Sequence, residues 1–298
     1  MNTVCVLLSS YNGENFIEDQ IDSILAQQNV KVKLFVRDDG STDATVSILE
    51  KYSQKGLLTF YAGSNLGWKK SFLDLMLNAP DSCFYAFSDQ DDYWHPNKLS
   101  NALEKLKSMK SGPNLYISNT FYWRGDFKKK TRISLPLLNK EHCLIWCLGP
   151  GCTMVFNKEL LELIQIAPPK IEIAHDKRLQ QVAALFGQIF YDMNSYIDYR
   201  QHGNNQLGAT VSFGETFRRR FKYYTSFKDN NILTVEASDL LTCYKHIMSN
   251  QNLSMCESLA HYRSKFSSYF KILMSSKFVH ENIMTTIAFK LMVLFRKL

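Results

Sequence analysis

The sequence predicts an α/β protein with a mainly parallel sheet covered by helices, followed by an α-helical C-terminal region. Two observations predict this class. Apolar runs rich in Val, Leu and Phe alternate with segments of helical period through the first two thirds of the chain, which is typical of a parallel sheet covered on both faces. From about residue 213 this alternation stops, and helical segments continue to the end.

Four apolar runs in the first part of the chain are expected to be strands, each followed by a helix. The first strand is VCVLLSS at 4–10, and the apolar residues between 16 and 25 then share one helical face. The later strands are expected at 32–41, 57–63 and 83–92, with helices at 46–52, at 70–78 and after Pro96.

Residues 113–210 continue with the same two kinds of segment. Strands are expected at 115–123, 152–157, 188–193 and 196–202, and helices at 158–166 and 175–187. We therefore assign residues 1–208 to one domain and residues 209–298 to a helical appendage.

The composition is that of a globular protein. Of the 298 residues, 45% are hydrophobic and 21% charged, which allows a large core and excludes a disordered, collagen-like or coiled-coil chain. The seven Cys lie mostly in apolar runs and fit no zinc spacing, so we interpret them as reduced core residues. The first residues do not resemble a signal peptide. We expect a cytoplasmic protein.

The excess positive charge is confined to the last third of the chain. Residues 1–208 contain 22 Lys+Arg and 22 Asp+Glu, whereas residues 209–298 contain 13 and 6. A neutral body with a basic C-terminal region predicts that this region meets an anionic surface, either a membrane or a nucleic acid.

Polar residues follow four of the expected strands directly. These segments are Ser9–Asn12, Asp38–Asp43, Gly63–Gly67 and Ser88–Asp92. Because ligands of open α/β sheets bind beyond the carboxyl ends of the strands, we expect the four segments to gather at one edge as a single site.

Two of these segments are acidic. Asp89, Asp91 and Asp92 would repel one another unless a cation shares them, and oxygen ligands without Cys favour Mg²⁺ or Mn²⁺. Asp38 and Asp39 end another strand, where a carboxylate can accept hydrogen bonds from a base or a ribose. Each segment alone also suits an acidic turn that caps a helix. Together they predict a site for a nucleotide diphosphate and its metal.

Several nucleotide-dependent classes are excluded. The sequence contains neither a P-loop nor a Gly-x-Gly-x-x-Gly fingerprint after a strand, so NTP hydrolysis and NAD chemistry lose their main support. A Gly-x-Ser-x-Gly nucleophile elbow is also missing.

The motif set resembles the family 2 glycosyltransferases of GT-A fold over residues 1 to about 208. The matching segments are Val6–Asn12, Asp38–Asp43 and Asp89–Asp92. Ser88–Trp94, Asn65–Gly67 and Tyr199–Asn205 look most like the bacterial rhamnosyltransferase branch. The resemblance implies a nucleotide-binding, Rossmann-like catalytic domain and an inverting, metal-dependent sugar transfer. Its acceptor would be a growing bacterial surface polysaccharide or a lipid-linked glycan.

The rhamnosyltransferase resemblance implies dTDP-L-rhamnose as the donor. UDP-glucose, UDP-galactose and UDP-N-acetylglucosamine remain alternative donors for the same machinery, and a nucleotide-binding scaffold without turnover is the non-enzyme alternative.

The resemblance also implies roles for individual residues. Asp38 and Asp39 would hold the base and ribose, Asp91 would be the direct metal ligand, and Asp176 would be the catalytic base. The remaining nucleotide contacts would be Ser9, Tyr11, Asn12, Asn65 and Asp89. Lys177-Arg178 departs from the aromatic residues that commonly follow the base in the family, which leaves the shape of the acceptor pocket open.

Further site residues are expected from their positions after strands. Arg200 suits a diphosphate contact, because guanidinium pairs well with phosphate, and His202 suits a metal or phosphate ligand, with a structural role as the alternative. We assign Trp94, Gly151 and His175 to the donor or acceptor pocket.

The basic C-terminal region ends in an apolar helix. On a helical wheel the apolar residues from Ile283 to Leu298 share one broad face, whereas Phe289 and Val293 lie on the polar side. The stretch is too short to cross a bilayer but can lie on one. We expect no nucleic acid partner. Attachment to the inner face of the cell membrane and packing against the catalytic domain or a second copy of the chain remain the alternatives.

Overall fold

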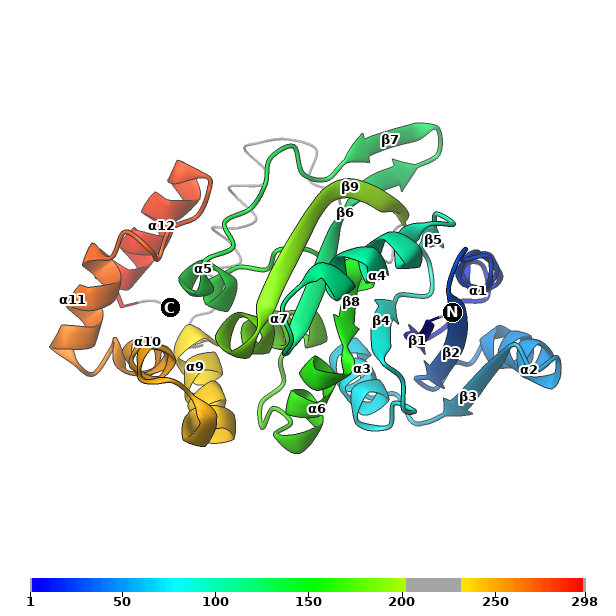
Figure 1. The fold of residues 1–298 in the computed structure, drawn as a ribbon, viewed down its shortest axis with the longest axis horizontal. Coiled ribbons are helices and arrows are strands. Elements are labelled where there is room, and N and C mark those ends of the chain that lie inside the picture. Colours follow the sequence, from blue (N-terminus) through cyan, green and yellow to red (C-terminus); the bar gives the residue numbers. More distant parts are fainter. Residues whose placement is uncertain (1, 202–231, 297–298) are drawn as a thin grey trace. The chain divides into compact units, whose positions relative to one another are not determined.

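The computed structural model describes residues 2–201 and 232–296 (Figure 1). The chain divides into two compact units. The first unit comprises Met1–Leu135, Cys147–Ile166 and Ala174–His202, and the second Pro136–Trp146, Ala167–Ile173 and Gly203–Leu298. The domain boundary at residue 208 lies outside the described residues and stays a prediction.

The first unit is built on one mixed sheet. Within the described residues the sheet has nine strands, in the order β3-β2-β1-β4-β8-β6-β9-β5, with β7 paired to β6. The strands are β1 (Thr3–Ser10), β2 (Lys31–Asp38), β3 (Leu58–Ala62), β4 (Phe84–Ser88), β5 (Tyr93–Trp94), β6 (Asn114–Arg124), β7 (Phe127–Lys130), β8 (Met154–Asn157) and β9 (Gln188–Arg200). The α/β fold class is confirmed.

Strand β1 lies between β2 and β4 and runs parallel to both. The strand order therefore reverses at β1, and the carboxyl ends of β1, β2 and β4 meet at one edge of the sheet. Such a switch point is where open α/β sheets place their ligands. The four polar segments predicted from the sequence follow β1, β2, β3 and β4.

Helices cover both faces of this sheet (Figure 1). Val4, Val6 and Leu8 of β1 share a core with α1 (Ile17–Leu25), α2 (Thr45–Gln54) and α4 (Lys98–Ser108). Successive side chains of a strand point to opposite faces, so the fully buried Cys5 and Leu7 face the other layer. That layer consists of α3 (Trp68–Leu77), α6 (Lys158–Ile166) and α7 (His175–Phe186).

The sheet differs from the pattern expected, which did not include β5 and β7. β8 pairs antiparallel with both β4 and β6, because the chain reverses there, and this direction is not encoded in the apolar run itself. The two strands expected at 188–193 and 196–202 form the single strand β9, with irregular pairing to β6 beside Ser118 and Asn119.

One glycine fixes the link between α7 and β9. Gly187 caps the end of α7, and β9 begins at the next residue. A Cβ at Gly187 would collide with the backbone carbonyl oxygen of Pro113, which accepts a hydrogen bond of 3.0 Å from the Gln188 N–H. No side chain therefore fits at this turn.

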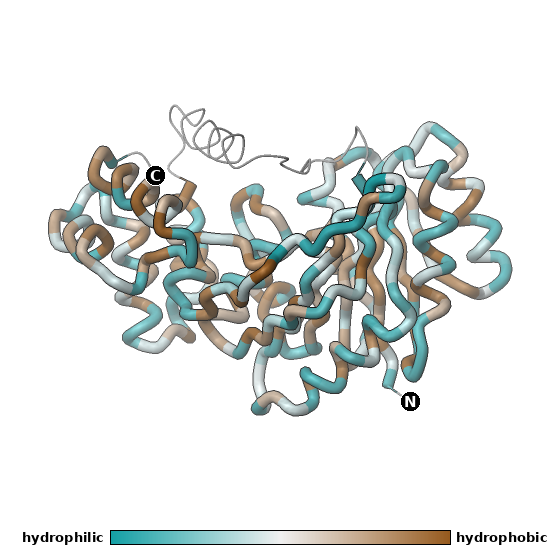
Figure 2. The backbone as a smooth tube through the Cα atoms, turned by 90° about the horizontal axis from the view of Figure 1, so that it is seen from above, coloured by the Kyte–Doolittle hydropathy of each residue, from teal (hydrophilic) through white to brown (hydrophobic). Residues whose placement is uncertain are grey.

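The second unit is helical, as the sequence predicts for the C-terminal region. The helices in its described part are α5 (Lys140–Ile145), α9 (Ile232–Tyr244), α10 (Asn250–His261), α11 (Phe266–Met274) and α12 (Ile283–Leu294), with the short 3₁₀ helix η2 (Lys245–Ile247) after α9. Leu240, Tyr244, Met255 and Leu259 form a core between α9 and α10. Figure 2 shows extended brown, hydrophobic stretches in the C-terminal helices. Within the described ranges, no helix has the length and hydropathy needed to cross a membrane.

Candidate functional site

The loops after β1 and β2 are joined by hydrogen bonds. The Asn12 N–H donates to Ser41 Oγ at 2.9 Å, and Asn12 Oδ1 accepts from the Thr42 N–H at 2.8 Å. Asn12 has a positive φ of 47°, which Asn tolerates better than most residues. The Ser10 hydroxyl adds a bond of 3.0 Å to Asp38 Oδ1. The loops after β1 and β2 thus form one connected rim at the carboxyl ends of the two strands.

The Asp38 carboxylate holds this rim together. It is fully buried, and its Oδ1 accepts from the hydroxyls of Ser10 and Ser41. Its Oδ2 accepts from the N–H groups of Gly40 and Ser41 at 3.1 and 2.8 Å. A carboxylate has about four acceptor sites, and these four hydrogen bonds fill them. In the structure Asp38 therefore stabilises the two loops, and its contact with a base or ribose stays a prediction.

Asp39 connects the rim to the loop after β3. It forms a buried ion pair with Arg37, and it accepts from the N–H groups of Leu66 and Gly67 at 2.8 and 2.9 Å. Oδ2 accepts a single one of these bonds, so this oxygen keeps acceptor capacity for a ligand. Asn65 lies in the same loop and accepts from the Gly67 N–H.

Arg37 ties helix α3 to this network. Its Nε donates to Asp74 at 3.0 Å and its Nη1 to the Ser71 hydroxyl at 3.0 Å, both on α3. The Ser71 hydroxyl also lies 2.6 Å from that of Ser9. Arg37, Ser71 and Asp74 were not among the expected site residues, although Arg37 precedes the acidic pair directly.

The acidic loop after β4 is anchored to the loop after β1 by Gln90. Its amide accepts from the Tyr11 N–H at 2.8 Å and donates to the Tyr11 carbonyl at 2.9 Å. A Cβ at Gly13 would collide with the same amide. Gln90 therefore places the acidic loop beside Tyr11. The sequence analysis gave Gln90 no role, although it stands within the acidic motif.

Asp89, Asp91 and Asp92 influence one another electrostatically. Burial raises the pKa of Asp89 to about 7, and the nearby charges of Asp91 and Asp176 add to this shift. Burial also raises the pKa of Asp92, with further contributions from Asp91 and Asp89. The structure thus brings together the acidic loop and Asp176, which are far apart in the sequence.

The donor atoms in this cluster suit a hard divalent cation. Ligand atoms of Asp89, Asp92 and Cys152 lie within 4.8 Å of one another, and this group does not include Asp91, whose role as the direct metal ligand stays a prediction. Asp92 is fully buried, and a hydrogen bond from the Arg200 backbone favours its ionised form. Burial raises the pKa of the Cys152 thiol above its usual value, and a protonated thiol is a poor metal ligand. The remaining donors are carboxylate oxygens, which Mg²⁺ and Mn²⁺ prefer.

Lys98 and Trp94 lie next to this cluster in the core. The Lys98 ammonium sits 3.6 Å from the centre of the Trp94 ring, and burial lowers the pKa of Lys98 to about 7. Both side chains are almost completely buried. Trp94 belongs to the core below the site, and its assignment to a donor or acceptor pocket stays a prediction without a contact in its favour.

Asp176 stands in the first turn of α7. Its Oδ1 accepts from the Lys177 N–H at 2.6 Å, and a hydrogen bond from the Gly151 backbone also stabilises its ionised form. Burial outweighs these bonds and raises the pKa of Asp176 to about 6. A carboxylate with this pKa is ionised at neutral pH and more basic than an exposed one, which suits proton abstraction.

His175 packs into an aromatic cluster. Its ring stacks on Phe72 with centroids 3.9 Å apart and meets Phe87 edge to face at 4.6 Å. Burial lowers the pKa of His175 to about 3, so the ring is neutral. The His175 ring and Gly151 are in direct contact, because a Cβ at Gly151 would overlap Nε2. The structure therefore joins the predicted residues Gly151, His175 and Asp176.

Arg200 reaches the acidic loop from the end of β9. Its Nε donates to the backbone carbonyl of Asp91 at 3.2 Å, and its Nη2 donates to Asp19 at 3.1 Å. The guanidinium also lies 4.6 Å from the Trp123 ring and 5.1 Å from the Phe16 ring. These contacts place Arg200 beside Asp91, and its contact with a diphosphate stays a prediction. His202 lies outside the described residues.

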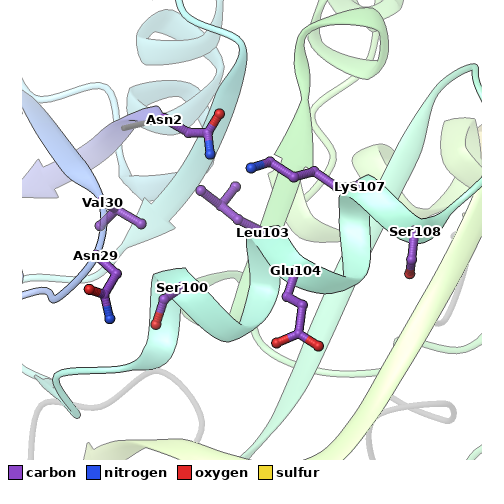
Figure 3. A pocket seen from close by; sticks show the side chains of 8 residues that line it. All are labelled: Asn2, Asn29, Val30, Ser100, Leu103, Glu104, Lys107 and Ser108. Carbon is purple, nitrogen blue, oxygen red and sulfur yellow. The ribbon is translucent and has the colours of Figure 1, made fainter.

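A separate depression opens at the opposite edge of the sheet. It measures about 500 Å³ and is lined by Asn2, Asn29, Val30, Ser100, Leu103, Glu104, Lys107 and Ser108 (Figure 3). Asn2 precedes β1 and Val30 precedes β2, so the depression lies at the amino ends of these strands. It shares no residue with the acidic cluster and does not belong to the candidate site.

The sequence of the chain matches one family model and several known proteins. The model of Glycosyl transferase family 2 matches residues 5–164. A dTDP-rhamnosyl transferase, RfbG, of Shigella flexneri is 32% identical over 239 residues, covering 73% of this chain and 80% of that protein. A beta-1,3-glucosyltransferase of Escherichia coli, WfaP, named as using UDP-Glc and a GlcNAc-diphosphoundecaprenol, is 28% identical over 153 residues, or 49% and 59% of the two chains.

Solved structures show the same fold at low sequence identity. Staphylococcus aureus TarS 1–349 in complex with UDP-GlcNAc has a TM-score of 0.61 at 16% identity, covering 98% of this chain and 81% of that one. The mannosyltransferase PcManGT from Pyrobaculum calidifontis, in complex with GDP-Man and Mn²⁺, has a TM-score of 0.53 at 16% identity, covering 99% and 86%. The predicted GT-A fold is confirmed.

Proposed function

Because the chain belongs to the family 2 glycosyltransferases, we propose that it transfers L-rhamnose from dTDP-L-rhamnose to a hydroxyl group of a bacterial surface polysaccharide or lipid-linked glycan. The family identifies a glycosyltransferase. The choice of rhamnose is supported by the 32% identity to a dTDP-rhamnosyl transferase, which extends over most of both chains.

The observation that carries the catalytic proposal is the electrostatic coupling of Asp89 to Asp91 and Asp176. Three carboxylates from two distant segments share one small region at the carboxyl ends of the strands. An inverting transfer needs this combination, with a base for the acceptor and an acidic loop for the donor diphosphate.

Asp176 acts in this proposal as the general base. Its carboxylate takes the proton from the acceptor hydroxyl as the oxygen forms a bond to the anomeric carbon of the donor. The bond between that carbon and the diphosphate oxygen breaks, and its electron pair leaves with the nucleotide. A positioned general base contributes about 10²- to 10⁴-fold to the rate.

The acidic loop and Arg200 hold the leaving group. Asp91, with Asp89, would hold Mg²⁺ or Mn²⁺, and the ion would neutralise charge on the departing diphosphate. The Arg200 guanidinium, placed by Asp19 and the Asp91 carbonyl, would add a charge-assisted hydrogen bond to a phosphate oxygen. The nucleoside would contact Asp39, whose Oδ2 keeps acceptor capacity, within the frame that Asp38 and Asn12 build.

A UDP-hexose is the second candidate donor. It is favoured by the similarity to WfaP, which is named as using UDP-Glc, and by the fold shared with TarS in complex with UDP-GlcNAc. The two candidates differ in the base and the sugar, so binding separates them.

The test compares donors on the 298-residue chain. Thermal unfolding is measured with Mn²⁺ and with dTDP-L-rhamnose, UDP-glucose, UDP-galactose or UDP-N-acetylglucosamine, and donor hydrolysis is followed by release of the nucleoside diphosphate. A ligand present at 100 times its Kd stabilises the fold by about 2.7 kcal/mol. We expect stabilisation and hydrolysis with dTDP-L-rhamnose. Stabilisation by a UDP-sugar alone would move the assignment to the second candidate, and binding without turnover would favour a scaffold.

A further inference from the structure

Helix α12 packs on the second unit with a narrow face. Phe289 and Val293 are its two buried residues, and the Phe289 ring meets the Trp146 ring at 5.1 Å. The sequence analysis placed these two residues on the polar side of the helix. The side of α12 with the fewest apolar residues therefore faces the protein.

The broad apolar face of α12 is consequently exposed. Between 45% and 72% of the surface of each of its large side chains is accessible. The residues are Ile283, Met284, Ile287, Leu291, Leu294 and Phe295. Isolated exposed apolar residues are common on proteins, but a continuous face of one helix marks a site of interaction.

Helix α11 adds to this apolar surface. Phe266, Phe270 and Met274 lie on one side of α11 and are 51–72% exposed, while Ile272 faces inward. The two helices are joined by Lys290, whose ammonium donates to the carbonyls of Ile272 at 2.6 Å and Ser275 at 2.8 Å. We name the nine exposed side chains of α11, α12 and Phe295 the apolar face.

The charge around the apolar face indicates what covers it. Residues 263–296 contain six cationic side chains and one acidic side chain, Glu281. The cations are Arg263, Lys265, Lys271, Lys277, Lys290 and Arg296, and all except Lys290 are exposed. Two copies of this segment would bring like charges together at an interface. Anionic lipid headgroups complement the charge, and acyl chains take the apolar side chains.

We propose that the apolar face of α11 and α12 docks on an anionic lipid surface. The 12 residues of α12 are too few to cross a hydrocarbon core, which needs about 20 residues, so the helix lies in the plane of the headgroups. The exposed cations at its margins hold the unit on the membrane, and the apolar side chains enter it. An enzyme held in this way works beside acceptors that are carried on lipids.

The test uses flotation of the 298-residue chain with vesicles. We expect it to float with vesicles of phosphatidylcholine and phosphatidylglycerol, and to float less with phosphatidylcholine alone or at high salt. The variant Ile287→Glu/Leu291→Glu should bind at least about tenfold more weakly, because it places charges in the buried interface. Ile166→Glu/Ile247→Glu is the matched control, since it changes two exposed Ile residues outside the apolar face and should bind normally.

Circular dichroism establishes that both variants are folded, and donor hydrolysis without lipid measures the transferase site independently. Unchanged flotation of Ile287→Glu/Leu291→Glu, or no flotation of the parent chain, would overturn the proposal. A dimer in sedimentation that this variant dissociates, without lipid binding by the parent, would overturn it in favour of a second copy of the chain.

Discussion

The imidazole of His175 occupies the space that any side chain at residue 151 would need. A Cβ at Gly151 would overlap Nε2 of His175, and the Gly151 backbone also hydrogen bonds with Asp176. One glycine therefore determines the position of the aromatic cluster and of the proposed base. The contact suggests a direct test of how the base is held.

Gly151→Ala is expected to displace His175 and to impair the enzyme. Overpacking of this kind costs about 1–3 kcal/mol, and the shift of Asp176 should lower kcat more than it changes donor binding. Thermal unfolding and donor hydrolysis measure the two effects. The double variant Gly151→Ala/His175→Ala should recover stability relative to the sum of the single changes. Strictly additive losses would show that the two residues do not clash.

Asp176→Asn should remove the general base without harming the fold. We expect kcat to fall by about 10²- to 10⁴-fold. The thermal midpoint should stay equal or rise, because burial disfavours the charged carboxylate in the folded state. Thermal unfolding and initial rates check both statements. An active variant would exclude Asp176 as the base.

The rate of the parent enzyme should depend on pH through Asp176. The base works when it is ionised, and its pKa is raised to about 6, so kcat should fall as the pH drops through about 6. The stability has the opposite dependence. A carboxyl group with a raised folded pKa destabilises the fold as the pH rises from its unfolded value near 3.8 through about 6. A kcat that does not change between about pH 5 and pH 7 would contradict this role.

Removal of divalent cations should abolish transfer, and Mg²⁺ or Mn²⁺ should restore it, because carboxylates supply the donor set. Asp91→Asn should lose this response while remaining folded. Isothermal titration of Mn²⁺ in the presence of nucleoside diphosphate measures the binding, with Asp81→Asn, an acidic residue remote from the cluster, as the control. Full activity in a chelator would show that the transfer does not need a metal.

Asp39→Asn should destabilise the protein strongly. It removes one of the two carboxylates paired with the buried Arg37 guanidinium and leaves Asp74 as the other, and breaking a buried pair costs up to about 3–5 kcal/mol. Asp81→Asn breaks the ion pair with Lys158, which has a distance of 2.6 Å but is exposed to solvent, and should therefore destabilise the protein much less. Urea unfolding of the two variants checks the contrast. Similar losses would mean that burial does not control the strength of these pairs.

The sequence predicted most of the strands, though not β5 and β7, and the edge where their polar loops meet, because periodicity and turn residues are local signals. It could not predict the antiparallel direction of β8, because the pairing partner of a short apolar run depends on distant parts of the chain. For the same reason, the acceptor sites of Asp38 could not be known to be filled by Ser10, Gly40 and Ser41.

The C-terminal helix shows the same limit. A helical wheel sorts residues by type, but it does not show which side meets the protein. Phe289 and Val293 lie opposite the broad apolar face, as the wheel predicts, but their burial could not be read from it. Asp89, Asp91 and Asp176 could be grouped through the family resemblance, whereas the supporting residues Gln90, Lys98 and Cys152 were found only in the structure.

The turn at Gly187 has a consequence for how this enzyme can change over evolution. It joins the helix that begins with His175 and Asp176 to the strand that ends with Arg200. Any mutation that adds a side chain there must push the start of β9 away from Pro113. Because α7 and β9 are stiff, we expect both elements to shift. A substitution at Gly187 is therefore expected to change the spacing between Asp176 and Arg200, whereas substitutions in the exposed loops are not.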